Sequence, residues 1–152
     1  MPKSDPPDPD FESRVRASFN TQQVMQAISA RLLTVGSGEA CIELPFRPEL
    51  TQQHGYIHAG IIGTIVDSAC GYAAYTLMPA DSEVLTVEYK VNFLAPAQGE
   101  TFVAIGRAIK PGRTLTVCAG EVWAYVQSEA KQVAAMQSTM MMVFNRVLKN
   151  RA

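Results

Sequence analysis

Gln52-Gln53-His54-Gly55-Tyr56-Ile57-His58-Ala59-Gly60 is a polar stretch that leads directly into a long apolar run, Ile61-Ile62-Gly63-Thr64-Ile65-Val66-Asp67-Ser68-Ala69-Cys70-Gly71-Tyr72-Ala73-Ala74-Tyr75-Thr76-Leu77-Met78. A helix that is apolar on every side belongs in the interior of a domain, so the run predicts a central buried helix. One carboxylate, Asp67, lies inside it. Because an unpaired buried charge is costly, Asp67 must be paired, protonated or used in chemistry, and a functional site is expected here.

Composition limits the classes of protein to be considered. The 152 residues suit a single domain with its own core, and a net charge of -1 gives no reason to expect nucleic acid or an anionic membrane as a partner. The three cysteines are widely spaced in apolar segments, which indicates reduced, buried thiols and a cytoplasmic location. We expect no membrane insertion, because the apolar run contains Asp67 and many small residues.

The remaining segments predict two short helices and a set of strands. Residues 1–10 are rich in proline and aspartate and are expected to form a disordered lead-in, followed by one domain over 11–150. Helical spacing covers 11–31 and is interrupted at Asn20-Thr21, an N-cap signal. Alternation in 85–93 predicts that Leu85, Val87 and the odd-numbered residues after them share one face. Strands are expected at 32–35, 39–45, 85–93, 101–109, 114–126 and 132–144.

This order of elements predicts an α+β fold. The last four strands follow one another through short connections, which favours an antiparallel meander. A sheet of about six antiparallel strands has one face to bury, and the central helix can fill it if the sheet curves around that helix. The exposed edges and the outer face of such a sheet favour dimerisation.

The loop and helix resemble a known family. The pattern Asn-x-x-Gly-x-x-His-Gly-Gly, followed by an acid further along the helix, is typical of the PaaI-type acyl-CoA thioesterases of the hotdog fold. The segment 85–97, with its closing Pro-Ala, resembles the family's strand after the helix, and 110–114 resembles its Gly-Arg/Lys-Thr hairpin. In the loop and helix the corresponding residues are Gln52 in place of Asn, Gly55, His58, Ala59 in place of the first Gly of the pair, Gly60 and Asp67.

The resemblance implies hydrolysis of acyl-CoA, with a medium-chain, long-chain or aryl acyl group, and without a cofactor or a metal ion. Backbone N–H groups at the helix start, around Gly60, would polarise the thioester carbonyl, because a helix N-terminus carries free donors and the positive end of the dipole. Asp67 would be either the general base or the nucleophile, and the sequence leaves both open.

Asp67 and the helix start are too far apart to serve one carbonyl within one chain. Nine residues separate Asp67 from His58, which is about 13 Å along a helix. We therefore expect a homodimer, in which Asp67 of one copy faces the Gly60 loop of the other, and a dimer of such dimers as the full assembly.

The other candidate residues each have two interpretations. His58 either orients the thioester or orders the loop, and Gln52 either donates its amide to the substrate or is a plain loop residue. Thr86 either holds the attacking water or is an ordinary strand residue. Lys110 and Arg113 either bind the phosphates of coenzyme A or are solvated at a hairpin tip, and Ala59 is a candidate contact of the substrate.

Two other functions fit the same pattern. A hotdog enoyl-CoA hydratase or dehydratase also pairs a histidine with an acid, and those two residues would converge on the α and β carbons of an acyl chain. A non-catalytic acyl-CoA-binding module would also fit, because Gln52 and Ala59 depart from the family pattern. Thiol release from a saturated acyl-CoA, water addition to an enoyl-CoA, and binding without turnover distinguish the three.

Overall fold

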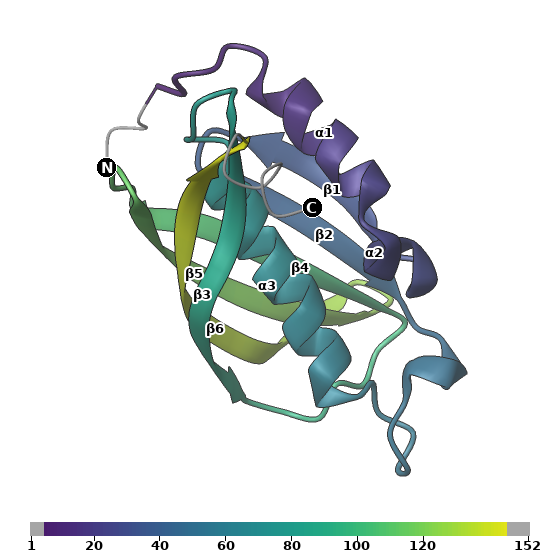
Figure 1. Cartoon of the computed structure of the whole chain (residues 1–152). Coiled ribbons are helices and arrows are strands. Elements are labelled where there is room, and N and C mark those ends of the chain that lie inside the picture. Colours follow the sequence, from purple (N-terminus) through teal and green to yellow (C-terminus); the bar gives the residue numbers. More distant parts are fainter. Residues whose placement is uncertain (1–4, 146–152) are drawn as a thin grey trace.

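The computed structural model describes residues 5–145. A curved sheet wraps around one long helix, α3, and two short helices lie beside it (Figure 1). This agrees with the expected α+β architecture. The elements are α1 Phe11–Thr21, α2 Gln23–Ala27, β1 Arg31–Gly36, β2 Glu39–Pro45, a 3-10 turn η1 Pro48–Leu50, α3 Ala59–Tyr75, β3 Ser82–Phe93, β4 Thr101–Lys110, β5 Leu115–Val126 and β6 Glu129–Phe144.

The sheet is fully antiparallel, with the order β1-β2-β4-β5-β6-β3. The expected meander is therefore correct for β4, β5 and β6 and wrong for β3, which pairs with β6 at the far edge of the sheet. The segment after β3 passes the start of α3, where the Ile57 N–H donates to the Ala97 carbonyl, and β4 then pairs with β2. Strands that follow one another in sequence are usually, but not always, neighbours in a sheet. The short connection between β3 and β4 therefore does not make these two strands pair.

Two facing glycines allow α3 to lie directly on the sheet. Gly106 of β4 is paired with Gly120 of β5. A Cβ at Gly106 would lie 2.2 Å from the carbonyl carbon of Ala69, and one at Gly120 would lie 2.5 Å from a methyl of Val66. Both distances are impossible for a real side chain, so the two glycines set the depth at which the helix packs.

A β-bulge changes the faces of β3. The register against β6 shifts between Thr86 and Glu88. Thr86 hydrogen-bonds to Asp67 of α3, while Tyr89, three residues later, brings its hydroxyl close to Gly63 of the same helix. Both residues therefore face the helix, and the predicted placement of all odd-numbered residues on one face is wrong.

Helix α1 is fastened to the C-terminal end of α3 by one arginine. The Arg14 guanidinium donates to the carbonyls of Tyr75 at 3.2 Å and Met78 at 2.8 Å, and it forms an ion pair with Asp8 at 2.7 Å. The Met78 carbonyl lies just beyond the end of α3, and the Tyr75 carbonyl, at its last residue, also accepts from the Met78 N–H, so Arg14 ties α1 to the end of this helix. Asp8 is buried, whereas residues 1–4 of the expected lead-in lie outside the described residues.

The boundary between α1 and α2 lies at Gln22, which has an extended backbone (ψ 99°), and not at the expected N-cap at Asn20-Thr21. The Asn20 carbonyl instead accepts a hydrogen bond from the Gln26 side chain. Cys70 and Cys118 are buried as expected, and Cys41 is half-buried. Within residues 5–145, the helices are too short or too polar to cross a membrane.

Adding one methyl group at Gly106 should destabilise the whole domain, because it would collide with the backbone of α3. We expect Gly106→Ala to lower the free energy of unfolding by about 3 kcal/mol or more, at or above the upper end of ordinary overpacking. Urea denaturation followed by circular dichroism measures this. The control is Gly36→Ala, where an added Cβ meets nothing within 4 Å, and equal stability of the two variants would contradict the packing described here.

Candidate functional site

Asp67 lies on α3 facing β3 and is half-buried. The Thr86 hydroxyl donates to Asp67 Oδ1 at 2.9 Å, which leaves Oδ2 for another partner. Burial raises the pKa of the Asp67 carboxyl above its ordinary value of 3.8, and the hydrogen bond from Thr86 lowers it in part. A carboxyl with a raised pKa next to a pocket is a typical candidate for a general base.

The start of α3 is organised by His58. His58 is the N-cap, and its Nδ1 accepts from the Gly60 N–H at 2.8 Å, while its own N–H donates to the Leu50 carbonyl. A Cβ at Gly60 would come within 3.1 Å of Nδ1. Gly60 thus makes room for the His58 ring, and its N–H, which the sequence offered as the donor to a carbonyl, is occupied by the imidazole.

Ala59 and Gln52 lie at a largely apolar hollow beside the helix start, with a volume of about 350 Å³. The Ala59 N–H has no hydrogen-bond acceptor among residues 5–145. The Gln52 side-chain oxygen accepts from the His54 N–H, so it orders the loop, and its amide nitrogen is left to donate elsewhere. The rest of the hollow is mostly aromatic and aliphatic, and Phe93 and Ile62 contribute to it.

A second pocket, of about 300 Å³, lies beside Asp67 and is mostly polar. Its walls come from α1, the α1–α2 boundary, α3 and the start of β3. Gln22 and Ser68 meet there, with Gln22 Nε2 3.4 Å from Ser68 Oγ. Helical periodicity in the N-terminal segment gave no sign that it reaches a site, so sequence reasoning missed these residues.

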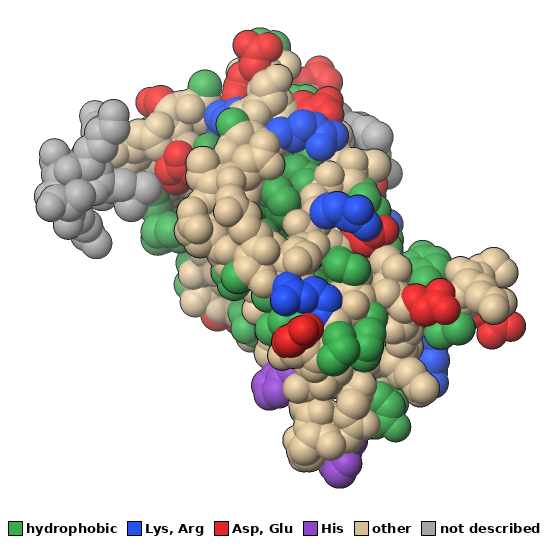
Figure 2. All heavy atoms as spheres, turned by 90° about the vertical axis from the view of Figure 1, so that its right-hand side faces the viewer, with side chains coloured by type: hydrophobic (Ala, Val, Ile, Leu, Met, Phe, Trp, Pro, Cys, Tyr) green, Lys and Arg blue, Asp and Glu red, His purple; other side chains and the backbone are tan. Residues whose placement is uncertain are grey.

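The predicted site residues therefore form two groups. Asp67 and Thr86 are together, while Gln52, His58, Ala59 and Gly60 gather at the helix start. Gly60 and Asp67 are seven residues apart, which places them on the same side of the helix but about 10 Å apart along it. The two histidines of the chain lie at one end of the face shown in Figure 2, on which acidic and basic side chains are interspersed.

Lys110 and Arg113 belong to neither group. They are exposed at the connection between β4 and β5 and do not line either hollow. Within residues 5–145, histidine, cysteine, aspartate and glutamate side chains form no group of three or more that could hold a metal ion.

This chain is similar in sequence to members of a known protein family. The family model described as "Thioesterase superfamily" matches residues 54–131, which include the loop from His54 onward, α3, β3, β4 and β5. The 1,4-dihydroxy-2-naphthoyl-CoA hydrolase of Listeria monocytogenes is 26% identical over 62% of this chain and 76% of its own length.

Solved structures show the same fold. A thioesterase family protein from Silicibacter pomeroyi superposes with a TM-score of 0.87 at 46% identity, covering 88% of this chain and 98% of the other. The E. coli PaaI protein superposes with a TM-score of 0.78 at 17% identity over 88% of this chain and 94% of its own, a likeness of fold. The hotdog fold implied by the sequence is confirmed, and the chain belongs to the thioesterase superfamily.

Proposed function

We propose that this protein hydrolyses acyl-CoA thioesters, with Asp67 as the catalytic carboxylate. The observation that supports this most is the half-buried Asp67, held by Thr86 and bordering a pocket, on the same helix side as an N-terminus that offers the free Ala59 N–H. An activated oxygen and a site that stabilises a developing oxyanion are what thioester hydrolysis needs.

As general base, Asp67 accepts a proton from water through Oδ2 while the water oxygen attacks the carbonyl carbon. The oxyanion is stabilised by the Ala59 N–H and by the helix dipole, since the Gly60 N–H of the same turn already donates to His58. The tetrahedral intermediate collapses, the C–S bond breaks, and the proton on Asp67 passes to the leaving thiolate. Attack by the carboxylate itself, through an anhydride that water then opens, uses the same groups.

Thr86 and His58 act as positioning residues in this proposal. The Thr86 hydroxyl donates its hydrogen to Asp67, so it orients the carboxylate and does not hold the water through that hydrogen. His58 caps α3 and fixes the direction of its N–H groups. Gln52, at the same hollow as Ala59, is placed to donate its amide to the thioester.

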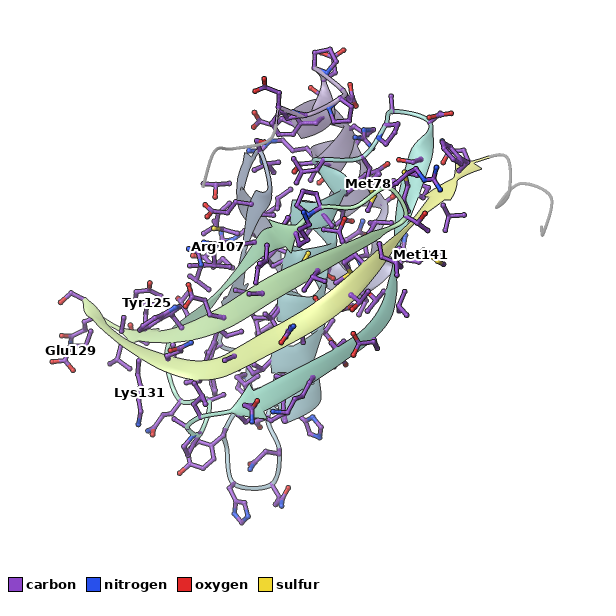
Figure 3. All side chains as sticks on the ribbon, turned by 90° about the vertical axis from the view of Figure 1, so that its left-hand side faces the viewer. Met78, Arg107, Tyr125, Glu129, Lys131 and Met141 are labelled. Atoms are coloured by element: carbon purple, nitrogen blue, oxygen red, sulfur yellow. The ribbon has the colours of Figure 1, made fainter. Side chains whose placement is uncertain are left out.

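Two copies of the chain would supply the two halves of the site. β3 is an edge strand, and Figure 3 shows it as the outermost ribbon beside β6. Its Val87 is 52% exposed and its Tyr89 47% exposed. An edge strand that stays free in solution is usually protected by charged residues or proline, so exposed apolar side chains here favour pairing with a second copy. Antiparallel pairing of two β3 strands about a two-fold axis would set two α3 helices in opposite directions, so that each Asp67 faces the partner's helix start.

Coenzyme A would lie with its phosphates at Lys110 and Arg113, two exposed cations where β4 ends and the chain turns into β5. Replacing both with alanine should raise KM for acyl-CoA with less effect on kcat.

Association of dimers into a tetramer is a further prediction, which the mass of the assembly in solution tests.

Asp67→Asn should lower kcat for thioester hydrolysis at least about a hundredfold, because the side-chain amide cannot accept the proton from water. The assay is thiol release across a panel of saturated acyl-CoAs, with water addition to an enoyl-CoA as the test of a hydratase. Retained thiol release in this variant would remove Asp67 from the mechanism. Binding of acyl-CoA without turnover in the wild type would identify a binding module.

The same variant should be more stable than the wild type at neutral pH. Because the folded-state pKa of Asp67 is raised, its ionised form costs stability above that pKa, and the cost disappears as the pH falls below the ordinary value of 3.8. Thermal unfolding at several pH values measures the difference, which should shrink on acidification. For the same reason kcat/KM of the wild type should fall on the acid side with an apparent pKa above 3.8.

The role of the helix start can be tested by removing one N–H. Proline is favoured at the first position of a helix, and His58, with φ -60° and ψ 137°, already has the backbone that precedes proline. Ala59→Pro should therefore fold normally and lose activity, whereas Ala59→Val, of similar size, keeps the N–H and should lose less. Equal activities would exclude the Ala59 N–H as an oxyanion donor.

Mixing two inactive variants tests the two-chain site. Co-expressed Asp67→Asn and Ala59→Pro chains should recover about a quarter of wild-type activity, since half of randomly formed dimers are mixed and each has one intact site of two. If the mixture stays inactive although mass spectrometry detects mixed dimers, both halves of the site come from one chain.

A further inference from the structure

Tyr89 brings a polar group to α3 on the side of Asp67 that faces the helix start. Along β3 it lies between Thr86, which bonds Asp67, and Phe93, which lines the hollow at the helix start. The register shift after Thr86 turns Tyr89 towards the helix. Its hydroxyl oxygen lies 3.9 Å from where a Cβ on Gly63 would be, so the phenol reaches the turn of α3 that precedes Asp67.

The Asp67 carboxylate leans towards this hydroxyl. Asp67 follows Gly63 by four residues, so the two share one face of α3 with their Cβ positions about 6 Å apart. Side chains on a helix tilt towards its N-terminus, which brings the carboxylate over the turn that contains Gly63. The carboxylate and the Tyr89 hydroxyl are not hydrogen-bonded to each other, and two oxygens about 5 Å apart are bridged by one water molecule.

The chain leaves both of these oxygens open to such a water. The Thr86 hydroxyl gives its hydrogen to Asp67 Oδ1, so it cannot hold the attacking water by that hydrogen. Among residues 5–145, Asp67 Oδ2 and the Tyr89 hydroxyl have no hydrogen-bond partner. Tyr89 is 47% exposed, so water reaches it, and a phenol hydroxyl both donates and accepts.

We propose that Tyr89 Oη and Asp67 Oδ2 together hold the water molecule that attacks the thioester. This rests on the thioesterase function proposed above and commits it to the general-base route. The water donates one hydrogen to Oδ2 and the other to Tyr89 Oη, which directs a lone pair at the carbonyl carbon. As the new C–O bond forms, the first proton moves to Asp67 and the second stays on the attacking oxygen. Collapse of the intermediate breaks the C–S bond, the proton on Asp67 passes to the thiolate, and Tyr89 is unchanged.

Tyr89→Phe removes the hydroxyl and keeps the ring. We expect kcat for saturated acyl-CoAs to fall about tenfold, the value of one hydrogen bond, with KM changed less than about twofold because the water is not part of substrate binding. The matched control is Tyr125→Phe. Tyr125 follows the buried Ala124 on β5, so it faces away from α3, and its replacement should keep wild-type kcat.

A water shared by two groups makes their substitutions non-additive. In an Asp67→Asn background, measured with enzyme in excess, adding Tyr89→Phe should lower the residual thiol release less than about twofold. A further tenfold loss there would mean that Tyr89 acts independently of Asp67, and the proposal would be wrong. A loss of kcat that disappears at higher protein concentration would assign Tyr89 to association of the copies and would equally overturn it.

Isotope labelling tests the commitment to a general base. In a single turnover in water labelled with a heavy oxygen isotope, the label should enter the acid product. Label found on Asp67 by mass spectrometry of the peptides would show that the carboxylate attacks first, and Tyr89 would then not hold the water that attacks the thioester.

A high-resolution crystal structure tests the water site without relying on activity. We expect a water within about 3.2 Å of both Asp67 Oδ2 and Tyr89 Oη in the wild type, and none at that position in Tyr89→Phe. An unbridged pair in the wild type, or wild-type kcat in Tyr89→Phe, overturns the proposal and leaves thioester hydrolysis intact. If no thioester is cleaved, the proposed function fails on its own, and the same structure still decides whether the two residues hold a water.

Discussion

The contact between α3 and the glycine pair of β4 and β5 is the constraint on which the rest of the structure depends. With no side chain at Gly106 or Gly120, the backbone of the helix near Ala69 rests directly on the sheet. This depth lets strands on both sides of the contact curve around the helix, and it fixes where the two ends of α3 emerge. The positions of Asp67 and of the helix start follow from it.

Side chains complete both ends of that helix, in a manner that matches its dipole. At the N-terminus the His58 ring nitrogen accepts a backbone N–H, and at the C-terminus the Arg14 cation binds carbonyls. Each of these residues also ties the helix to another segment, the loop before it or helix α1. The helix is therefore held along its length by packing and at its ends by hydrogen bonds, and among residues 5–145 its Asp67 carboxylate has a hydrogen bond from Thr86 and no ion pair.

Much of this could be predicted from the sequence. The apolar run, the polar loop before it and the spacing of strands gave the central helix, the six strands and the family. Position along the chain could not reveal that β3 lies at the far edge, because pairing is decided by contacts between distant residues. The bulge after Thr86 was equally hidden, because apolar and polar residues alternate through 85–93 without a break at the extra residue. The candidate site was predicted at its two ends, Asp67 and the helix start. Gln22 was missed because a glutamine between two short helices has no distinctive pattern, and the use of the Gly60 N–H by His58 depends on a ring orientation that no spacing encodes.

The fastening of α1 through Arg14 has a consequence for how such a protein can change over time. The N-terminal helices contribute to the site through a small number of side chains, while the glycine contact, Asp67 and the loop before α3 lie in a different part of the chain. If the proposed function holds, substitutions in the helices would therefore alter which molecules are accepted without disturbing the chemistry or the packing of the sheet. Evolution, or a protein engineer, could diversify this segment as an exchangeable cover and retain the same reaction beneath it.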